Sequence, residues 1–167
     1  MELFGDWIKP EWMLSIFADI RYFSQHTFIF LTKCPQNLPK WTFLENCWVG
    51  VTATNPQMYH EAIVHLARIK ATVKFISIEP MLSQFWVGEI SPYVNWLIIG
   101  AQTKPYKPPK IEWVQEIVQA ADKADVPVFL KNNLLGDARL DLITADMDWA
   151  FEQGECNWER LRQEFPK

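Results

Sequence analysis

VKFISIEPML, residues Val73–Leu82, is the stretch from which the fold can be inferred. Its first six residues form a short, mostly apolar run, which predicts a β-strand buried on both faces, as in a parallel sheet. Glu79 follows directly, in front of Pro80. A carboxylate at the end of a buried strand is expected to face a ligand or a neighbouring positive charge. What stands at the other strand ends decides how Glu79 is interpreted.

Four further runs of this kind predict a sheet of about five strands. They are TFIFLT from Thr27, CWVGVT from Cys47, VNWLIIGAQ from Val94 and VPVFLKNN from Val126. These runs are short and continuously apolar rather than alternating, which is typical of strands covered on both sides.

Helical segments are predicted between most of these strands. One follows Pro10, one opens with Asn55 as N-cap and Pro56 at the first helical position, and one covers about Lys110 to Ala124. Strands alternating with helices predict an α/β fold of parallel βα units with right-handed crossovers. We expect residues 1–167 to form a single domain, with an irregular or helical tail at 134–167 that packs over the bottom or side of the sheet.

The composition narrows the class of protein. With 167 residues, 49% of them hydrophobic, the chain is long enough to bury a core. A net charge of −4 argues against a broadly basic nucleic-acid binder, although TKPYKPPK, residues 103–110, is a local basic run. Three scattered cysteines predict reduced thiols and a cytoplasmic location, and every apolar run is shorter than the roughly 18 residues of a membrane-spanning helix.

Polar side chains stand at the end of every predicted strand. In a parallel sheet these ends meet at one edge, where ligands bind. We therefore predict Glu79 and Lys131 as catalytic residues, with Glu79 accepting a hydrogen bond or a proton from a ligand. The predicted ligand-binding residues are Thr32, Lys33, Thr52, Asn55, Gln102, Thr103 and Asn132. The structural alternative is that Glu79 neutralises Lys131 or Lys33 in a semi-buried ion pair.

Several common cofactor motifs are absent from the sequence. There is no GxGxxG or GxxxxGK[ST] phosphate loop, no GxSxG elbow and no CxxC pair. His60 and His65 are five residues apart, which does not place them on one helical face. No metal site is predicted.

The ordered set of strand segments resembles the phage Gp37/Gp68-like proteins, a group described as radical-SAM-like. The matching pieces are FIFLTKCPQNL, WVGVTATN, FISIEPML, WLIIGAQT and VPVFLKNN, within about residues 1–133. The family's FEPLLG resembles Ile78–Ser83, with Glu79 as the matching carboxylate, and its FKQWG resembles Leu130–Asn133. Its LTKRP resembles Leu31–Pro35, and its GGESG resembles Gly100–Thr103, with Gln102 in place of the acidic residue.

The resemblance implies part of a (β/α) TIM-type barrel and S-adenosylmethionine as a possible cofactor. The family's cysteine-bearing segment would lie before Met1, so this chain is expected to form no iron–sulfur cluster alone. Five strands leave two open sheet edges, which predicts a homo-oligomer or a cluster-bearing partner chain.

Three functions follow from these features. The first is the carboxyl-terminal part of a radical-SAM-like enzyme that binds a small molecule at the strand ends. The second is a non-catalytic module that binds a nucleotide or nucleic acid through Lys33, Lys104, Lys107 and Lys131. The third is a structural phage or mobile-element protein that acts through its exposed edges.

Overall fold

The computed structural model describes residues 2–85, 88–134, 150 and 161–166. Its helices and strands are α1 (Pro10–Tyr22), β1 (Phe28–Thr32), η1 (Pro35–Lys40), β2 (Cys47–Thr52), α2 (Pro56–Leu66), β3 (Val73–Ile78), β4 (Trp96–Ile99), β5 (Gln102–Thr103), β6 (Tyr106–Lys107), α3 (Ile111–Lys123), β7 (Val128–Leu130) and η2 (Asn132–Leu134). The chain has the predicted α/β fold.

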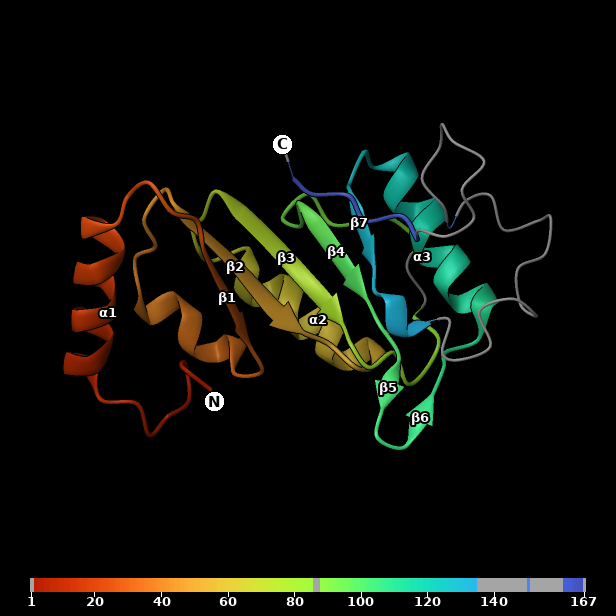
Figure 1. Ribbon diagram of the computed structural model, residues 1–167, viewed down its shortest axis with the longest axis horizontal. Helices are drawn as coiled ribbons and strands as arrows, with labels where there is room; N and C mark the ends of the chain where they lie inside the picture. The colour runs from red at the N-terminus through yellow and green to blue at the C-terminus, as the bar shows by residue number, and fades with distance from the viewer. Residues whose placement is uncertain (1, 86–87, 135–149, 151–160, 167) are drawn as a thin grey trace.

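Five strands form one sheet in the order β1-β2-β3-β4-β7, and all four pairings are parallel. Each strand of this sheet after β1 therefore pairs with the sheet strand that comes before it along the chain. The two-stranded β5–β6 hairpin stands apart beyond the end of β4 (Figure 1). The helix α2 crosses behind the sheet between β2 and β3, and α3 lies beside β7 (Figure 1). All five carboxyl ends meet at the edge next to the hairpin.

Local signals in the sequence fix the start of the central crossover helix. Asn55 is extended, and its side-chain oxygen accepts a hydrogen bond of 3.0 Å from the Met58 amide, as expected of an N-cap. Pro56 occupies the first helical position, where its missing N–H is not needed. The prediction for this helix is confirmed, and the helix brings Ala62 and Leu66 into the core.

The two faces of the sheet are covered differently. The face toward α2, which we call the helix side, belongs to a continuous core that also includes residues of α1, η1 and α3. The opposite face, which we call the inner face, carries a smaller cluster of Val73, Phe75 and Trp96. Trp48, Ile98 and Phe129 pack against this cluster.

The two outer strands also differ. Residues 161–166, the C-terminal segment, run antiparallel beside β7 with an isolated bridge between Phe129 and Gln163. The Leu130 amide donates to the Arg162 carbonyl (2.8 Å), and the Glu164 amide donates to the Val128 carbonyl (3.0 Å). Within the described residues, β1 pairs with β2 alone and its other edge is free.

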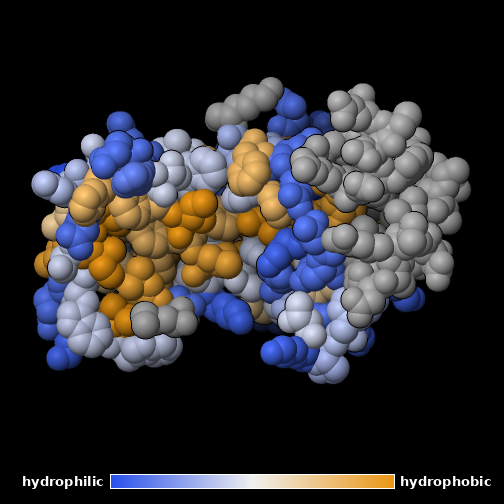
Figure 2. Space-filling view, viewed as in Figure 1, coloured by the Kyte–Doolittle hydropathy of each residue, from blue (hydrophilic) through white to orange (hydrophobic). Residues whose placement is uncertain are grey.

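The strand β1 departs from the expectation that every strand is buried on both faces. Ile29 and Leu31 point to the inner face and are 55% and 47% exposed. Figure 2 shows apolar residues at the surface over this part of the sheet. The reason is that nothing in the described part of the chain crosses the inner face in front of β1.

One further feature was not predicted, namely that the lysine-rich run after β4 forms the β5–β6 hairpin. The loop between β3 and β4, where no helix was predicted, contains none in its described residues. The predicted tail at 134–167 lies largely outside the described residues. Its described C-terminal segment pairs with β7 at the side of the sheet.

Candidate functional site

A cleft of about 370 Å³ lies at the carboxyl edge of the sheet. It is lined by Leu31, Lys33, Thr52, Ser77, Glu79, Pro80, Ala101, Gln102, Thr103 and Lys104. These residues come from the ends of four consecutive stretches of the chain, β1 to β4, and from the hairpin that follows β4. The cleft is therefore where a parallel sheet is expected to bind ligands.

Glu79 is held in place on the wall of this cleft. Its Oε1 lies 2.7 Å from Nζ of Lys131, and its Oε2 accepts a hydrogen bond from the same Nζ at 2.8 Å. Nδ2 of Asn133 donates to Oε1 at 3.2 Å. The side chains of Lys131 and Glu79 are 41% and 25% exposed, so the ion pair remains in contact with solvent.

Gly100 makes room for this carboxylate. A Cβ atom at position 100 would lie 2.9 Å from both Cδ and Oε1 of Glu79, closer than real Cβ contacts allow. The backbone here is also fixed, because the Gly100 amide donates to the Ile78 carbonyl (3.1 Å) and its carbonyl accepts from the Met81 amide (3.0 Å). The glycine thus lets Glu79 lie directly against β4.

The structure brings five of the predicted ligand-binding or catalytic positions to the cleft lining. They are Lys33, Thr52, Glu79, Gln102 and Thr103. Lys131 joins them through its ion pair with Glu79. The side chain of Gln102 donates to the Pro105 carbonyl at 2.9 Å, which steadies the hairpin at the rim.

Three predicted positions lie elsewhere. Thr32 is buried, and its hydroxyl donates to Oε1 of Glu2 at 2.6 Å. Asn55 caps α2, and Asn132 accepts a hydrogen bond from Gln163 at 3.1 Å. Each of these side chains serves a local structural contact instead of lining the cleft.

Sequence reasoning did not single out Ser77 or Asn133 as site residues. Ser77 is buried on the floor of the cleft, and it stands two residues before Glu79, which places both on the same face of β3. That spacing was the available signal. Asn133 also donates to the Ala101 carbonyl (3.1 Å) and accepts from the Ala101 amide (3.2 Å), contacts that arise only once β4 and β7 are adjacent.

Comparison with known proteins places this sequence in a family. The family model described as "Protein of unknown function (DUF5131)" matches residues 1–149, which is most of the chain. The chain belongs to the DUF5131 family. No curated protein and no solved structure matches it.

Within the described part of this DUF5131 chain, no helix is long and apolar enough to cross a membrane. No group of three or more His, Cys, Asp or Glu side chains in the same residues is placed to hold a metal ion.

The two cysteines described in this DUF5131 chain, Cys34 and Cys47, are fewer than the four thiolates that hold a typical iron–sulfur cluster. Burial, with the carboxylates of Glu2 and Asp6, raises the pKa of the Cys34 thiol above its ordinary value. Burial also raises the pKa of Cys47, which is fully enclosed in the helix-side core. Both environments favour the neutral thiol, and Cys156 lies outside the described residues.

Proposed function

We propose that this chain is the carboxyl-terminal, ligand-binding part of a radical-SAM-like protein, and that its carboxyl-edge cleft binds S-adenosylmethionine. The observation that supports this proposal is the charge arrangement of the cleft. Glu79 is fixed by Lys131 and Asn133, while the ammonium groups of Lys33 and Lys104 have no ion-pair partner among the described residues. The ordered resemblance of the strand segments supplies the choice of cofactor.

The cleft residues complement the groups that S-adenosylmethionine carries. The ligand's carboxylate would pair with the ammonium of Lys33 or Lys104. Its ammonium or ribose hydroxyls would donate to Glu79, because a carboxylate has about four acceptor positions and those on Glu79 are not all used. When bound, the cofactor would supply a sulfonium centre with a reactive carbon–sulfur bond.

The cluster that the resemblance implies is not assigned to the described residues in this proposal. The described cysteines lie in environments that favour neutral thiols, and we derive no step through the cluster. The role of this chain would be to bind and orient the small molecule.

Isothermal titration calorimetry with S-adenosylmethionine tests the proposal. We expect saturable binding to the parent chain and strong loss of affinity in Glu79→Gln, which keeps the shape of the side chain but removes its charge. Glu89→Gln is the matched control, since Glu89 is exposed and its side chain has no hydrogen-bond or ion-pair partner in the described part of the chain. This control should bind as the parent does.

The outcomes separate the cofactor from the site. Absence of binding to a folded parent chain would overturn the assignment of S-adenosylmethionine. Binding that is equal in the parent and in Glu79→Gln would place the cofactor outside this cleft. Loss of binding in Lys33→Gln as well would support the predicted pairing with the ligand's carboxylate.

A second candidate function rests on the open side of the sheet. The free edge of β1 and the exposed Ile29 and Leu31 offer a surface for another protein chain, as a copy of this chain or as the cluster-bearing partner. Apolar side chains next to unpaired backbone groups favour strand addition. Measurement of the molar mass in solution across a range of concentrations tests for self-association. A chain that stays monomeric would exclude a second copy of this chain as the partner.

A further inference from the structure

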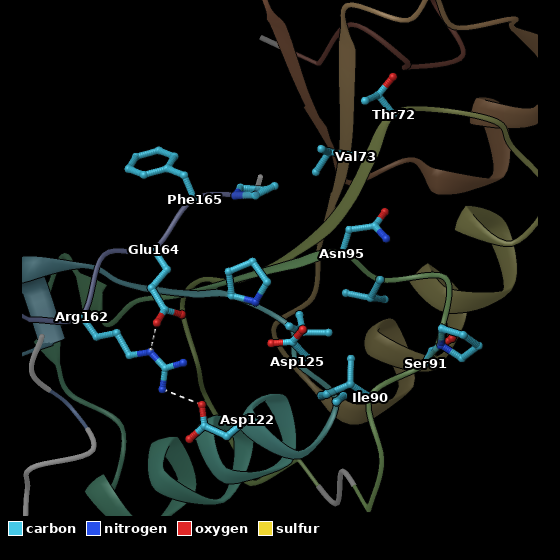
Figure 3. Close-up of a pocket in the computed structure, with 16 residues that line it drawn as sticks. Thr72, Val73, Ile90, Ser91, Asn95, Asp122, Asp125, Arg162, Glu164 and Phe165 are labelled. Atoms are coloured by element: carbon cyan, nitrogen blue, oxygen red, sulfur yellow. Dashed lines mark ion pairs between the residues drawn. The ribbon is translucent and has the colours of Figure 1, made fainter. Parts of the chain in front are cut away.

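We propose that a second cleft, at the opposite end of the strands, binds a small organic cation with an apolar body. This cleft has a volume of about 820 Å³, within the range of about 300–1,000 Å³ that is usual for small-molecule sites. It lies where β3 and β4 begin, between the turn that follows α3 and the C-terminal segment (Figure 3). It shares no lining residue with the carboxyl-edge cleft.

The charged groups of this cleft leave negative charge in excess. Three carboxylates line it, those of Asp122, Asp125 and Glu164, together with one cation, Arg162. Nη1 of Arg162 lies 2.7 Å from Asp122, and its Nε lies 2.8 Å from Glu164 (Figure 3). The guanidinium is thus occupied by two carboxylates, and its side chain is 17% exposed. Asp125 is left without a hydrogen-bond or ion-pair partner for its side chain in the described part of the chain.

The turn after α3 holds Asp125 at the cleft. The Val126 amide donates to the Ala121 carbonyl (3.0 Å), and the Asp125 amide donates to the Asp122 carbonyl (3.2 Å), the two bonds of a Schellman motif. Asp125 occupies the left-handed position of this motif, with φ of 54°. Glycine fits that position best, although Asp and Asn are tolerated there. The backbone therefore fixes the point from which this carboxylate extends.

The rest of the lining is suited to an apolar body. Phe165 and the rings of Pro92, Pro127 and Pro166 line the cleft, with the apolar side chains of Ile90 and Val94. Phe165 is 58% exposed, and its ring is supported from beneath by Trp96 at a centroid distance of 5.5 Å. The proline rings and the aliphatic side chains of Ile90 and Val94 can contact the apolar body of an arylalkyl or alkyl ammonium ion, while Asp125 in the same lining supplies the unpaired carboxylate.

A matched pair of probes tests this inference. 2-Phenylethylamine is cationic at neutral pH, whereas 2-phenylethanol has the same ring and chain length but no charge. Titrations of the ¹⁵N-labelled full chain, followed by two-dimensional amide NMR, should show saturable shifts around Val126 with the amine. The affinity for the alcohol should be at least about fivefold lower than that for the amine. The affinity for the amine should fall as salt is added.

Two variants assign the binding to named groups. Asp125→Asn removes the charge while keeping a residue that tolerates the left-handed backbone, so the fold should be retained. We expect about fivefold weaker amine binding in this variant and no change in Asp19→Asn, an exposed position on α1. Phe165→Leu should lower the affinity for the amine and for the alcohol to a similar extent.

Three results would overturn the inference. They are absence of saturable binding by the amine, equal affinity for amine and alcohol, and unchanged amine affinity in Asp125→Asn. Binding of S-adenosylmethionine should be the same in Asp125→Asn as in the parent, so this experiment is independent of the proposed function.

Discussion

The helix side and the inner face of the sheet are both apolar, yet they are buried by different means. On the helix side, α1, η1, α2 and α3 contribute to one core together with the strands. On the inner face, the described side chains form a smaller cluster, rich in aromatic rings, on β2, β3, β4 and β7. Over β1 the inner face is open, with Ile29 and Leu31 exposed.

The difference follows from the order of the strands. When every strand pairs with its predecessor and every crossover is right-handed, the connections all fall on one face. The other face must be covered by closure of the sheet, by a further segment or by another molecule. Here the C-terminal segment does part of this work, since Phe165 packs on Trp96 and Phe129.

The largest effect is expected from the centre of the inner-face cluster. Trp96 is 4% exposed, and its ring contacts those of Trp48, Phe75, Phe129 and Phe165. Its Nε1 also donates to the Glu164 carbonyl at 2.8 Å. Trp96→Ala should lower the free energy of unfolding by about 3–5 kcal/mol in urea denaturation.

Ile29→Ala is the control for this prediction on the open part of the same face. Because Ile29 is already 55% exposed, the loss should be about 1 kcal/mol or less. Equal losses at the two positions would mean that the inner face over β1 is covered in solution.

A smaller loss is expected at Gly50, where the inner face has no spare volume. A Cβ atom at this position would overlap the ring of Phe75. Gly50→Ala should therefore lower the free energy of unfolding by about 1–3 kcal/mol, because the ring must move within a packed cluster. Gly88→Ala is the control, since a Cβ atom there meets nothing within 4 Å and chemical denaturation should show little change.

On the helix side, one substitution should stabilise the fold. The hydroxyl of Tyr59 is buried and has no hydrogen-bond partner among the described residues. Tyr59→Phe removes this unsatisfied group and should raise the free energy of unfolding by about 1 kcal/mol. A loss instead of a gain would mean that a bound water satisfies the hydroxyl.

The same residue predicts a pH dependence. Burial raises the pKa of Tyr59 to about 12. The phenol of the unfolded chain ionises near pH 10. Ionisation of Tyr59 therefore leaves the free energy of unfolding unchanged below pH 10 and lowers it as pH rises from 10 to 12. Thermal denaturation across this range should show a smaller decline for Tyr59→Phe than for the parent.

The smallest effect on stability is expected on the open surface of β1. The double variant Ile29→Lys/Leu31→Lys should change the free energy of unfolding by about 0.5 kcal/mol or less, since both side chains are largely exposed. Lysines on an edge strand oppose strand pairing. If the parent self-associates through this edge, light scattering should show a lower molar mass for the double variant.

The sequence allowed most elements of the sheet to be predicted, because apolar runs and helix caps are local signals. The strand at Val73–Ile78 and the start of α2 after Asn55 agree with the prediction. The exposure of Ile29 could not be predicted, since a continuously apolar run looks the same whether or not a neighbour covers it. The pairing of the C-terminal segment with β7 is likewise a long-range contact without a local signal.

The candidate site was predictable in outline and less so in detail. Because parallel strands end at one edge, Glu79 and Lys131 were expected to lie close together, and Nζ of Lys131 is 2.7 Å from Oε1 of Glu79. Alternation along β1 explains the case of Thr32, whose side chain faces the helix side, whereas Lys33 reaches the cleft. The second cleft escaped prediction because its lining comes from stretches that are far apart in the chain.

The sequential order of the strands has a consequence for how the chain is made. As translation proceeds, each sheet strand after β1 meets an edge that is already synthesised, so only β1 has to wait for its first partner. Pairing of successive sheet strands also keeps each crossover shorter than it would be in a sheet whose strands pair out of chain order. The C-terminal segment differs in its connection, because a long stretch of chain separates it from β7, with which it forms a bridge, and from Trp96, on which Phe165 packs.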